Sequence, residues 1–413
     1  MQIQIKAPES IRGKVFLPAS KSISNRALVL NTLAAGKDLP VNVSDCDDTK
    51  VMLQWLAQRP EVVNIGAAGT AMRFSAALLA VSEGTHTITG TERMQNRPIA
   101  VLVDALRTLG ATIEYVGREG YPPLRITGNK SLAGGGVTLR GDVSSQYISA
   151  LLMIAPTLQK GLRLNLTDEI VSRPYINMTL AMMREFGAVA DWESDNVIKV
   201  QPGGYLSKKY VVENDWSAAS YWYEMLALSS HAEDQVVLPG LFAQSLQGDS
   251  CGAKVFEKLG VQTSYHEDGV KLTKSPAVVS RLDYDFVEMP DLAQTFVVTC
   301  CLMGVPFHFT GLQSLKIKET DRINALKVEL AKLGFLLEDR NDSELLWAGQ
   351  RTAIQPEASI DTYEDHRMAM AFAPAALRLG SIRINHPEVV SKSYPRYWDD
   401  LQSVGFTLEK TVL

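Results

Sequence analysis

Cysteine is scarce in this chain, with four residues among 413. Cys300 and Cys301 are adjacent within an apolar run, and Cys46 and Cys251 lie far from them and from each other. A disulfide-stapled domain needs a denser set of cysteines, and a structural zinc site needs them at short, regular spacings. The cysteine pattern therefore argues against both, and we expect no bound metal.

The chain also lacks an excess of positive charge and a long apolar run. Its 41 basic and 46 acidic residues give a net charge of -5, whereas nucleic-acid binding needs a basic face. No stretch reaches the roughly 20 apolar residues of a membrane span, and residues 1–8 alternate like a strand rather than forming a signal peptide. We therefore expect a cytoplasmic protein without nucleic-acid or membrane partners. Acidic small substrates are still allowed, because a local cationic pocket does not need a cationic protein.

A loose internal repeat organises what the sequence does contain. One half of the repeat is a polar cluster that opens an apolar helix. After a shorter first step it returns about every 74 residues, at Ser20, Gly69, Ser144, Ser217, Asp291 and Asp365. The other half is an amphipathic helix that ends before a glycine, at Gly110, Gly187, Gly260, Gly334 and Gly405. Short apolar runs after these glycines, such as 111–115 and 335–337, predict strands.

The length of the repeat indicates the fold class. Solenoid repeats are usually about 20–45 residues long, so a longer unit is closer to a small βαβ-type fold. Six such units predict an α/β protein with two domains of three units each. The glycine- and proline-bearing stretch 201–205, just before Glu213, is a plausible crossing between domains. The first copy departs from the pattern, since its second helix ends at Arg59 and Pro60 without a glycine.

Several of the predicted helix starts carry a cation in their first turn. Capping explains the Ser, Thr and Asp residues of these clusters. It does not explain the cations, which the helix dipole disfavours at this end. An anionic ligand would compensate them. The residues concerned are Lys21, Arg26, Arg73, Lys318, Arg322 and Arg367.

The densest cluster is 316–322, in which five of seven residues are charged. It lies between a predicted strand at 307–311 and a predicted helix at 323–330. A lysine, a carboxylate and an arginine at such a junction suit the binding of a phosphate and the movement of a proton. The alternative is a solvated helix start with local ion pairs at helical spacing.

Nine motifs, in order along nearly the whole chain, resemble the enolpyruvyl-shikimate-phosphate synthase family. They are Leu17–Ala27, Ala68–Arg73, Asn96–Ile99, Ser144–Gln146, Ser172–Ile176, Pro290–Asp291, Lys318–Arg322, Asp365–Ala369 and Ser391–Lys392. The resemblance implies an inside-out α/β barrel of six βαβαββ units in two domains, 1–19 with 214–413 and 20–213. It places the active site in the cleft between them.

The activity implied by the resemblance is a transfer reaction of the shikimate pathway, which leads to aromatic amino acids. The enolpyruvyl group of phosphoenolpyruvate would pass to the 5-hydroxyl of shikimate 3-phosphate through a tetrahedral intermediate, with release of phosphate. No cofactor would take part. The family also implies a monomer and a target of the inhibitor glyphosate.

Site residues follow from the resemblance position by position. The catalytic set would be Lys21, Asp291, Lys318 and Glu319. Shikimate 3-phosphate would be held by Lys21, Ser22, Arg26, Ser144, Ser145, Gln146, Ser172, Tyr175, Asp291 and Lys318. Phosphoenolpyruvate would be held by Lys21, Gly69, Arg97, Gln146, Arg322, Arg367 and Lys392. Asp291 would accept the hydroxyl proton, and Glu319 would exchange a proton with the methylene carbon.

Two positions depart from the family pattern, because Ala67 and Ser314 stand where asparagine is common. Two alternatives are kept open. One is enolpyruvyl transfer to UDP-N-acetylglucosamine, although that branch typically has asparagine where Ser22 stands and a loop cysteine that 92–97 lacks. The other is a non-catalytic binder of phosphorylated metabolites, which would be expected to lose Asp291 or Glu319.

Overall fold

The computed structural model describes residues 1–411, with the side chain of Ile317 excepted. The chain divides into two units. Unit 1 contains residues 1–18 and the chain from Glu213 onward, and unit 2 contains Ala19–Val212. Within the described residues, no helix combines the length and apolarity needed to cross a membrane.

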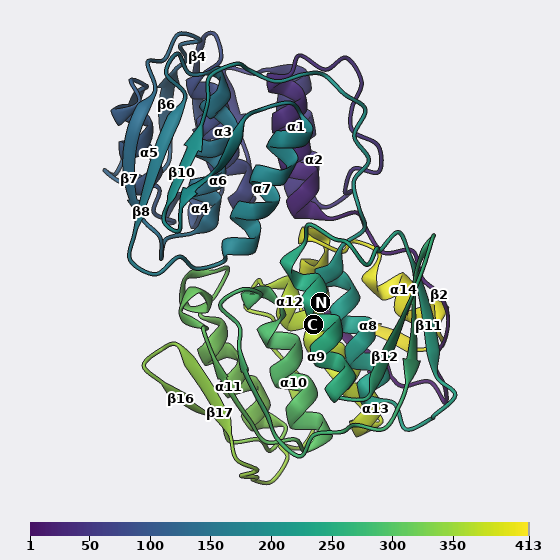
Figure 1. Ribbon diagram of the computed structural model, residues 1–413. Helices are drawn as coiled ribbons and strands as arrows, with labels where there is room; N and C mark the ends of the chain where they lie inside the picture. The colour runs from purple at the N-terminus through teal and green to yellow at the C-terminus, as the bar shows by residue number, and fades with distance from the viewer. Residues whose placement is uncertain (412–413) are drawn as a thin grey trace. The chain divides into compact units, whose positions relative to one another are not determined.

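The repeat predicted from the sequence is a βαβαββ unit, seen twice in full in unit 2 (Figure 1). Each copy forms a four-stranded sheet, β3-β4-β6-β5 or β7-β8-β10-β9. The first two strands of each order are parallel and the remaining pairs antiparallel. The first copy comprises β3 (Val62–Asn64), α3 (Gly69–Ala80), β4 (Thr85–Thr89), α4 (Glu92–Gln95), α5 (Ala100–Thr108), β5 (Thr112–Tyr115) and β6 (Leu124–Thr127). The second comprises β7 (Gly135–Arg140), α6 (Ser145–Ile154), β8 (Leu162–Thr167), α7 (Arg173–Glu185), β9 (Ala190–Ser194) and β10 (Val197–Val200).

Unit 1 repeats the same arrangement in three sheets, β2-β11-β13-β12, β14-β15-β17-β16 and β18-β19-β1-β20. The N-terminal strand β1 (Gln2–Lys6) pairs antiparallel with both β19 and β20, so the start of the chain completes the last sheet. The first sheet has β2 (Arg12–Lys14), α8 (Trp216–Leu228), β11 (Gln235–Pro239), α9 (Gly252–Lys258), β12 (Val261–His266) and β13 (Gly269–Lys274). The second has β14 (Leu282–Asp285), α10 (Ala293–Met303), β15 (Phe307–Thr310), α11 (Arg322–Lys332), β16 (Glu338–Arg340) and β17 (Glu344–Trp347). The third has β18 (Ser359–Ile360), α12 (His366–Phe372), α13 (Ala376–Leu379), β19 (Ser381–Asn385), α14 (Tyr397–Ser403) and β20 (Thr407–Thr411).

The remaining copy, in unit 2, is the one that departed from the pattern in the sequence. It contains α1 (Lys21–Leu33) and α2 (Asp47–Gln58), and its described strand pairing is the parallel bridge between Val41 and Val211. Arg59 ends α2 in the left-handed conformation, with φ 44°, where the other copies use glycine. The chain thus reaches the same helix stop with a residue that adopts this conformation at some energetic cost.

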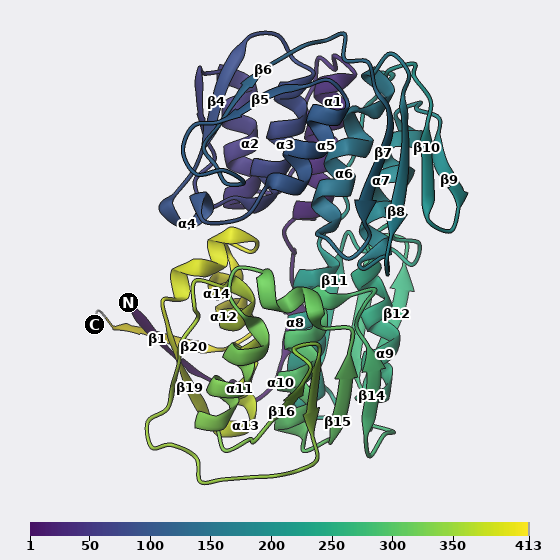
Figure 2. The same cartoon turned by 90° about the vertical axis from the view of Figure 1, so that its left-hand side faces the viewer.

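The helices of each repeat differ in burial. The first helix, which opens with the polar cluster, is buried almost all round: every residue of α3 and α12 is buried, as is nearly all of α8 and α10. A helix without a polar face belongs in a protein interior, and in unit 1 these helices lie inside the strands (Figure 2). The second helices end at the predicted glycines in positive-φ conformations, for example 103° at Gly110 and 85° at Gly334.

One predicted strand is displaced. Residues 335–337 do not form a strand; Phe335 makes an isolated bridge with Arg351, and β16 begins only at Glu338. Phe335 is instead used for packing, with its ring 5.4 Å from that of Trp347 in an edge-on contact. The apolar run after Gly334 therefore serves the core before the chain extends.

A buried acid in unit 1 predicts how stability depends on pH. Glu224 of α8 is 0% exposed, and burial raises the pKa of its carboxyl well above 4.5. The hydroxyl of Thr299 offsets this only in part, because its own proton is donated to the Thr295 carbonyl at 2.7 Å. The folded state therefore holds a proton that the unfolded state releases above about pH 4.5.

Glu224→Gln should consequently flatten the alkaline side of the stability profile. In the wild type this group lowers the free energy of unfolding as pH rises from 4.5 towards its raised pKa, by at most about 1.4 kcal/mol per pH unit. The glutamine variant should be more stable than the wild type at pH 8, with a smaller difference at pH 5. Denaturant midpoints at the two pH values measure this. A variant that is equally destabilised at both would contradict the neutral state of Glu224.

Candidate functional site

A buried guanidinium organises the charged residues of unit 1. Arg322, the first residue of α11, is 1% exposed. Its Nε donates to Asp365 Oδ2 at 2.7 Å, its Nη1 to Asp291 Oδ1 at 3.2 Å and its Nη2 to Glu319 Oε2 at 2.9 Å. Carboxylates from three separate segments therefore meet at one cation.

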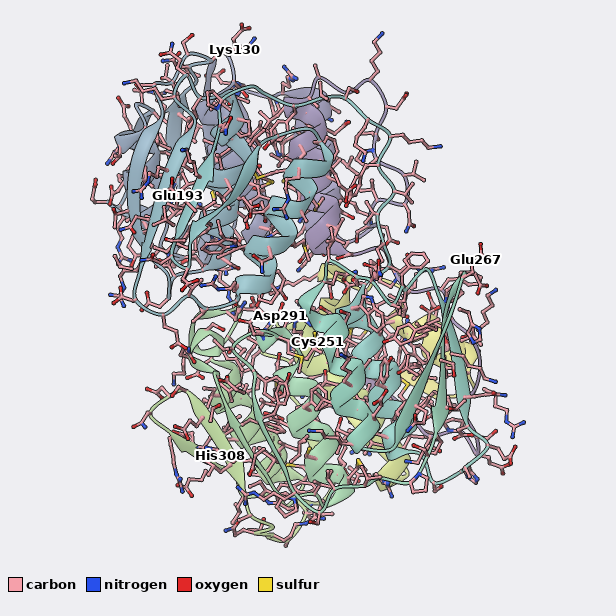
Figure 3. The ribbon with its side chains drawn as sticks, in the orientation of Figure 1. Lys130, Glu193, Cys251, Glu267, Asp291 and His308 are labelled. Carbon is pink, nitrogen blue, oxygen red and sulfur yellow. The ribbon has the colours of Figure 1, made fainter. Side chains whose placement is uncertain are left out.

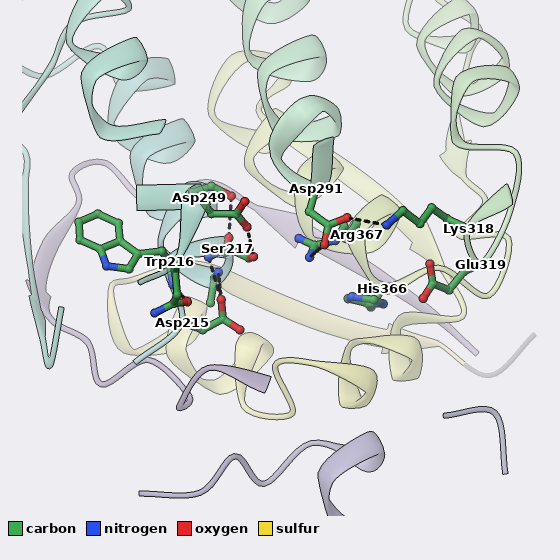
Figure 4. A network of polar contacts seen from close by, with 12 residues as sticks. Asp215, Trp216, Ser217, Asp249, Asp291, Lys318, Glu319, His366 and Arg367 are labelled. Carbon is green, nitrogen blue, oxygen red and sulfur yellow. Dashed lines mark hydrogen bonds and ion pairs between the residues drawn. The ribbon is translucent and has the colours of Figure 1, made fainter. Parts of the chain in front are cut away.

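Asp291 is in turn surrounded by cations. Besides Arg322, it accepts a hydrogen bond from Arg367 Nη2 at 2.8 Å and lies 3.5 Å from Lys318 Nζ. Figure 4 shows Asp291 between Arg367 and Lys318, with Glu319 beside the lysine. The Asp291 side chain is 19% exposed, so it keeps access to solvent although three cations compensate its charge.

Local sequence explains why these side chains converge. Asp291 lies in the short helix Pro290–Leu292 that leads into α10, and Asp365 caps α12 by accepting from Arg367 N at 2.9 Å. Asp321 caps α11 in the same way through Asn324 N at 3.0 Å. The site is therefore built at the starts of α10, α11 and α12. Figure 3 shows Asp291 at this end of unit 1, with His308 on the outer sheet far from it.

The charges of segment 316–322 serve two purposes: some form local ion pairs at the helix start, and others belong to the cluster around Arg322. Lys316 pairs with Asp321 at 2.6 Å and with Asp342 at 2.9 Å, as expected for a locally paired helix start. Lys318 and Glu319 instead face the Asp291 and Arg322 side chains. Two charges of the segment thus stabilise the turn, and the others belong to the cluster.

Lys392 and His366 lie at the edge of the cluster. Lys392 Nζ donates to the carbonyl of Glu364 at 2.7 Å, directly before the turn that carries Asp365 and Arg367. His366 is 2% exposed, and its Nδ1 lies 3.8 Å from Asp365 Oδ1. Lys392 therefore supports the backbone of the same turn.

In unit 2, two guanidinium groups flank the start of α3. Arg73 Nη1 donates to the carbonyl of Gly69 at 2.9 Å. A Cβ added at Gly69 would lie 2.6 Å from Arg97 Nη1 and 3.2 Å from Arg73 Nη1. Gln146 of α6 reaches the same helix start, where its Nε2 donates to Thr70 Oγ1 at 3.1 Å. The predicted residues Gly69, Arg97 and Gln146 are therefore neighbours.

A second group in unit 2 surrounds Arg26 of α1. Its Nε donates to Thr179 Oγ1 at 2.7 Å, its Nη2 to Ser149 Oγ at 3.0 Å and its Nη1 to the Ser22 carbonyl at 2.9 Å. Thr179 in turn donates to the Tyr175 carbonyl at 2.8 Å. Burial lowers the pKa of Arg26 to about 10, which still leaves it charged at neutral pH. Arg26 thus joins α1, α6 and α7 through hydroxyl groups.

The other predicted residues of unit 2 lie at helix starts. Lys21 is the first residue of α1, and Ser145 follows the α6 cap Ser144, whose Oγ accepts from Gln146 N at 3.4 Å. Ser172, before α7, has φ 57° and makes no capping hydrogen bond. A left-handed, non-glycine residue costs roughly 1–3 kcal/mol, and such strain is concentrated at functional sites.

Two charged residues of these clusters, Asp365 and Arg73, were missing from the predicted site. Asp365 is the buried partner of Arg322, and Arg73 is the second guanidinium at Gly69. The sequence placed both at helix starts, where Asp365 was explained as a cap. Asp365 contacts Arg322 of another repeat, and Arg73 lies with Arg97 at Gly69, so neither arrangement could be known from the local sequence.

Fold and site together define a two-unit α/β protein whose buried helices present cations and carboxylates at their N-termini. A family model described as EPSP synthase (3-phosphoshikimate 1-carboxyvinyltransferase) matches residues 5–59 and 55–401. The chain therefore belongs to the EPSP synthase family, as its motifs indicated.

Relatives and solved structures agree with this family. A protein of Bacteroides fragilis named 3-phosphoshikimate 1-carboxyvinyltransferase is 61% identical over 409 residues, covering 99% of each chain. A protein of Sulfurovum with the same name is 36% identical, covering 98% of this chain and 99% of its own. The structure of EPSP synthase from Acinetobacter baumannii has a TM-score of 0.80 at 21% identity, covering 99% of this chain and 100% of that one. The predicted fold class is thus confirmed.

Proposed function

We propose that the chain transfers the enolpyruvyl group of phosphoenolpyruvate to the 5-hydroxyl of shikimate 3-phosphate and releases phosphate. The observation that carries the proposal is the cluster in which Asp291 and Glu319 both contact the buried Arg322. Carboxylates held beside cations can move protons while an anion is bound. The 61% identical relative named for this transferase supports the same reaction.

In the proposed mechanism Asp291 accepts the proton of the 5-hydroxyl as its oxygen attacks C2 of phosphoenolpyruvate. Glu319 donates a proton to the methylene carbon, which gives the tetrahedral intermediate. Glu319 then removes a proton from that carbon as phosphate leaves, so the double bond is restored, and the proton held by Asp291 passes to the released phosphate. Lys318 would neutralise charge that develops during these steps. The family resemblance assigns Lys21 to the catalytic residues as well.

The anionic substrates would also activate the base. In the structure Asp291 accepts from Arg322 and Arg367, and it shares Arg322 with Asp365 and Glu319. A phosphate or carboxylate that contacts these arginines competes for them and reduces the charge compensation of Asp291. Substrate binding would therefore make Asp291 a better proton acceptor at the moment when the hydroxyl is present.

The substrate ligands are proposed from the resemblance, position by position. For phosphoenolpyruvate the proposed ligands are Lys21, Gly69, Arg97, Gln146, Arg322, Arg367 and Lys392. For shikimate 3-phosphate they are Lys21, Ser22, Arg26, Ser144, Ser145, Gln146, Ser172, Tyr175, Asp291 and Lys318. Arginine suits this task because its planar fork binds carboxylate or phosphate through two hydrogen bonds. A monomer is proposed from the resemblance alone, and the cytoplasm is proposed as the location expected from the sequence.

Phosphate release is the direct test of the function. The chain is incubated with phosphoenolpyruvate and either shikimate 3-phosphate or UDP-N-acetylglucosamine. We expect phosphate only with shikimate 3-phosphate, and in equal amount to the enolpyruvyl product. Release with the nucleotide sugar would support the alternative transferase, and binding of shikimate 3-phosphate without release would support a non-catalytic binder.

Gly69→Ala is expected to weaken inhibition by glyphosate by at least about tenfold, which is roughly 1.4 kcal/mol. The new methyl would lie 2.6 Å from Arg97 Nη1, so this guanidinium has to move from the proposed anion site. We expect phosphoenolpyruvate to be weakened less, because it is shorter than the inhibitor. Gly136→Ala is the matched control, since its Cβ meets no atom within 4 Å. Superimposed inhibition curves for wild type and Gly69→Ala would remove Gly69 from the phosphoenolpyruvate site.

A further inference from the structure

Asp249 lies beside the unit 1 cluster and has no role in the mechanism above. It is in the short helix Gly248–Cys251 that leads into α9, and it is 5% exposed. Its Oδ2 accepts a hydrogen bond from Ser217 Oγ, whereas its Oδ1 is buried without a hydrogen-bond partner among the described residues. Figure 4 shows Asp249 next to the Asp291 and Arg367 pair, on the side away from Lys318. A buried polar atom without a partner requires a physical explanation.

The turn before Asp249 is held in place by Gln247. The Gln247 Nε2 donates to Glu213 Oε2 at 2.9 Å and to the Asn214 carbonyl at 2.8 Å, and its Oε1 accepts from Trp216 N at 3.1 Å. Both N–H groups of this amide and one lone pair of its oxygen therefore hold the turn in place. Asp249 is consequently presented to the cluster by a rigid segment.

The charged and polar groups that face Asp249 come from three other segments. Asp215 and Ser217 lie at the start of α8, Asp291 lies before α10, and Arg367 lies in α12. Burial, and next the charge of Asp291, raise the pKa of Asp249 to about 7, while Arg367 and the Ser217 hydrogen bond act in the opposite direction. At neutral pH this carboxyl is therefore shared between its neutral and ionised forms.

We propose that Asp249 is a positioning residue that balances the charge around Arg367 and Asp291 by taking up one proton when an anionic ligand occupies the cluster. This inference rests on the proposed function, because the ligand is the phosphate or carboxylate of a substrate. Such an anion adds negative charge beside Asp249 and engages the arginine that favoured its ionised form. The proton comes from solvent and converts one carboxylate to a carboxylic acid. Asp291 then stays ionised as the proton acceptor, without a second carboxylate opposing the substrate.

The sign of the pH dependence follows from this uptake. Binding that takes up a proton becomes tighter as pH falls and weaker as pH rises above the pKa of Asp249, about 7 in the free protein. One linked proton changes the affinity by at most about tenfold per pH unit. Asp249→Asn is neutral at every pH and should lose this slope. At pH 8 it should therefore bind the anion about threefold to tenfold more tightly than the wild type does.

Calorimetry in two buffers with different ionisation enthalpies measures the proton directly. Phosphoenolpyruvate is titrated at pH 7.5 into the full chain without shikimate 3-phosphate, so that no transfer can take place. We expect the wild type to take up at least about half a proton more than Asp249→Asn does. Ionisation of the ligand itself contributes equally to both proteins, so it cancels in this difference. Asp268→Asn, in the exposed turn between β12 and β13, is the matched control and should behave as the wild type. Equal proton counts in wild type and Asp249→Asn, or weaker binding by the variant at pH 8, would overturn the proposal.

Ser217→Ala provides a second variant that leaves Asp249 in place. Loss of the Ser217 hydrogen bond disfavours the ionised carboxyl, so the pH above which the affinity falls should move upward. An unchanged pH profile would overturn the proposal even if Asp249→Asn did not fold. Turnover of the wild type is measured first. If there is none, the proposed function fails, and titration with inorganic phosphate decides the role of Asp249 separately.

Discussion

Glu319→Gln is expected to lower turnover by roughly 10² to 10⁴, the usual contribution of a general acid or base. Glutamine keeps the shape of the side chain and an oxygen that can accept from Arg322 Nη2, now at 2.9 Å from Glu319 Oε2. What it loses is the proton that Glu319 would give to the methylene carbon and take back. The affinity for shikimate 3-phosphate should stay within about tenfold, because the cations of the cluster are unchanged.

Turnover is measured with both substrates saturating, and the affinity for shikimate 3-phosphate is measured separately by titration. Glu357→Gln is the control for the same chemical change, since the Glu357 side chain is 81% exposed and forms an ion pair with Arg383 at 3.3 Å, outside the cluster. Turnover near that of the wild type in Glu319→Gln would exclude Glu319 from the proton transfers. A loss of affinity without a loss of turnover would make it a binding residue.

The repeat was predictable because it leaves regular marks in the sequence. Glycines such as Gly110 and Gly334 stop the second helices in conformations that other residues adopt poorly, so their spacing follows the spacing of the units. The displaced strand shows the limit of this reasoning. The run 335–337 is apolar because Phe335 packs against Trp347, and apolar content alone does not separate packing from pairing.

The site was predictable in part. A cation in a first helical turn is locally unfavourable, so its presence at Arg322 and Arg367 indicated a partner of opposite charge. The sequence suggested a ligand, whereas the structure shows carboxylates in contact with these arginines. Asp291, from the same repeat as Arg322, contacts both arginines, and Asp365, from the next repeat, contacts Arg322. Asp249 gave no signal, because its pairing with Ser217 joins positions 32 residues apart that only the fold brings together.

Arg322→Met is expected to destabilise unit 1 by about 3–5 kcal/mol, the usual result of removing one partner of a buried ion pair. Methionine fills much of the space of arginine but leaves Asp365, whose side chain is 0% exposed, without the guanidinium that donates to it at 2.7 Å. Most of the loss would come from the buried charge that remains, rather than from the attraction that is removed. Chemical unfolding, followed by the fluorescence of the unit 1 tryptophans, measures the shift of the midpoint.

A second substitution separates these two contributions. Asp365→Asn removes the charge, yet its amide oxygen can still accept from Arg367 N and cap α12, as Asp365 Oδ1 does now at 2.9 Å. The double variant Arg322→Met with Asp365→Asn should therefore regain most of the stability that Arg322→Met loses, while turnover stays low because the anion-binding guanidinium is absent. Arg340→Met is the control at an exposed pair with Glu338 and should leave the midpoint close to that of the wild type. If the double variant is no more stable than Arg322→Met, the buried charge of Asp365 is not the source of the loss, and Arg322 stabilises the unit through its packing or through Asp291 and Glu319 instead.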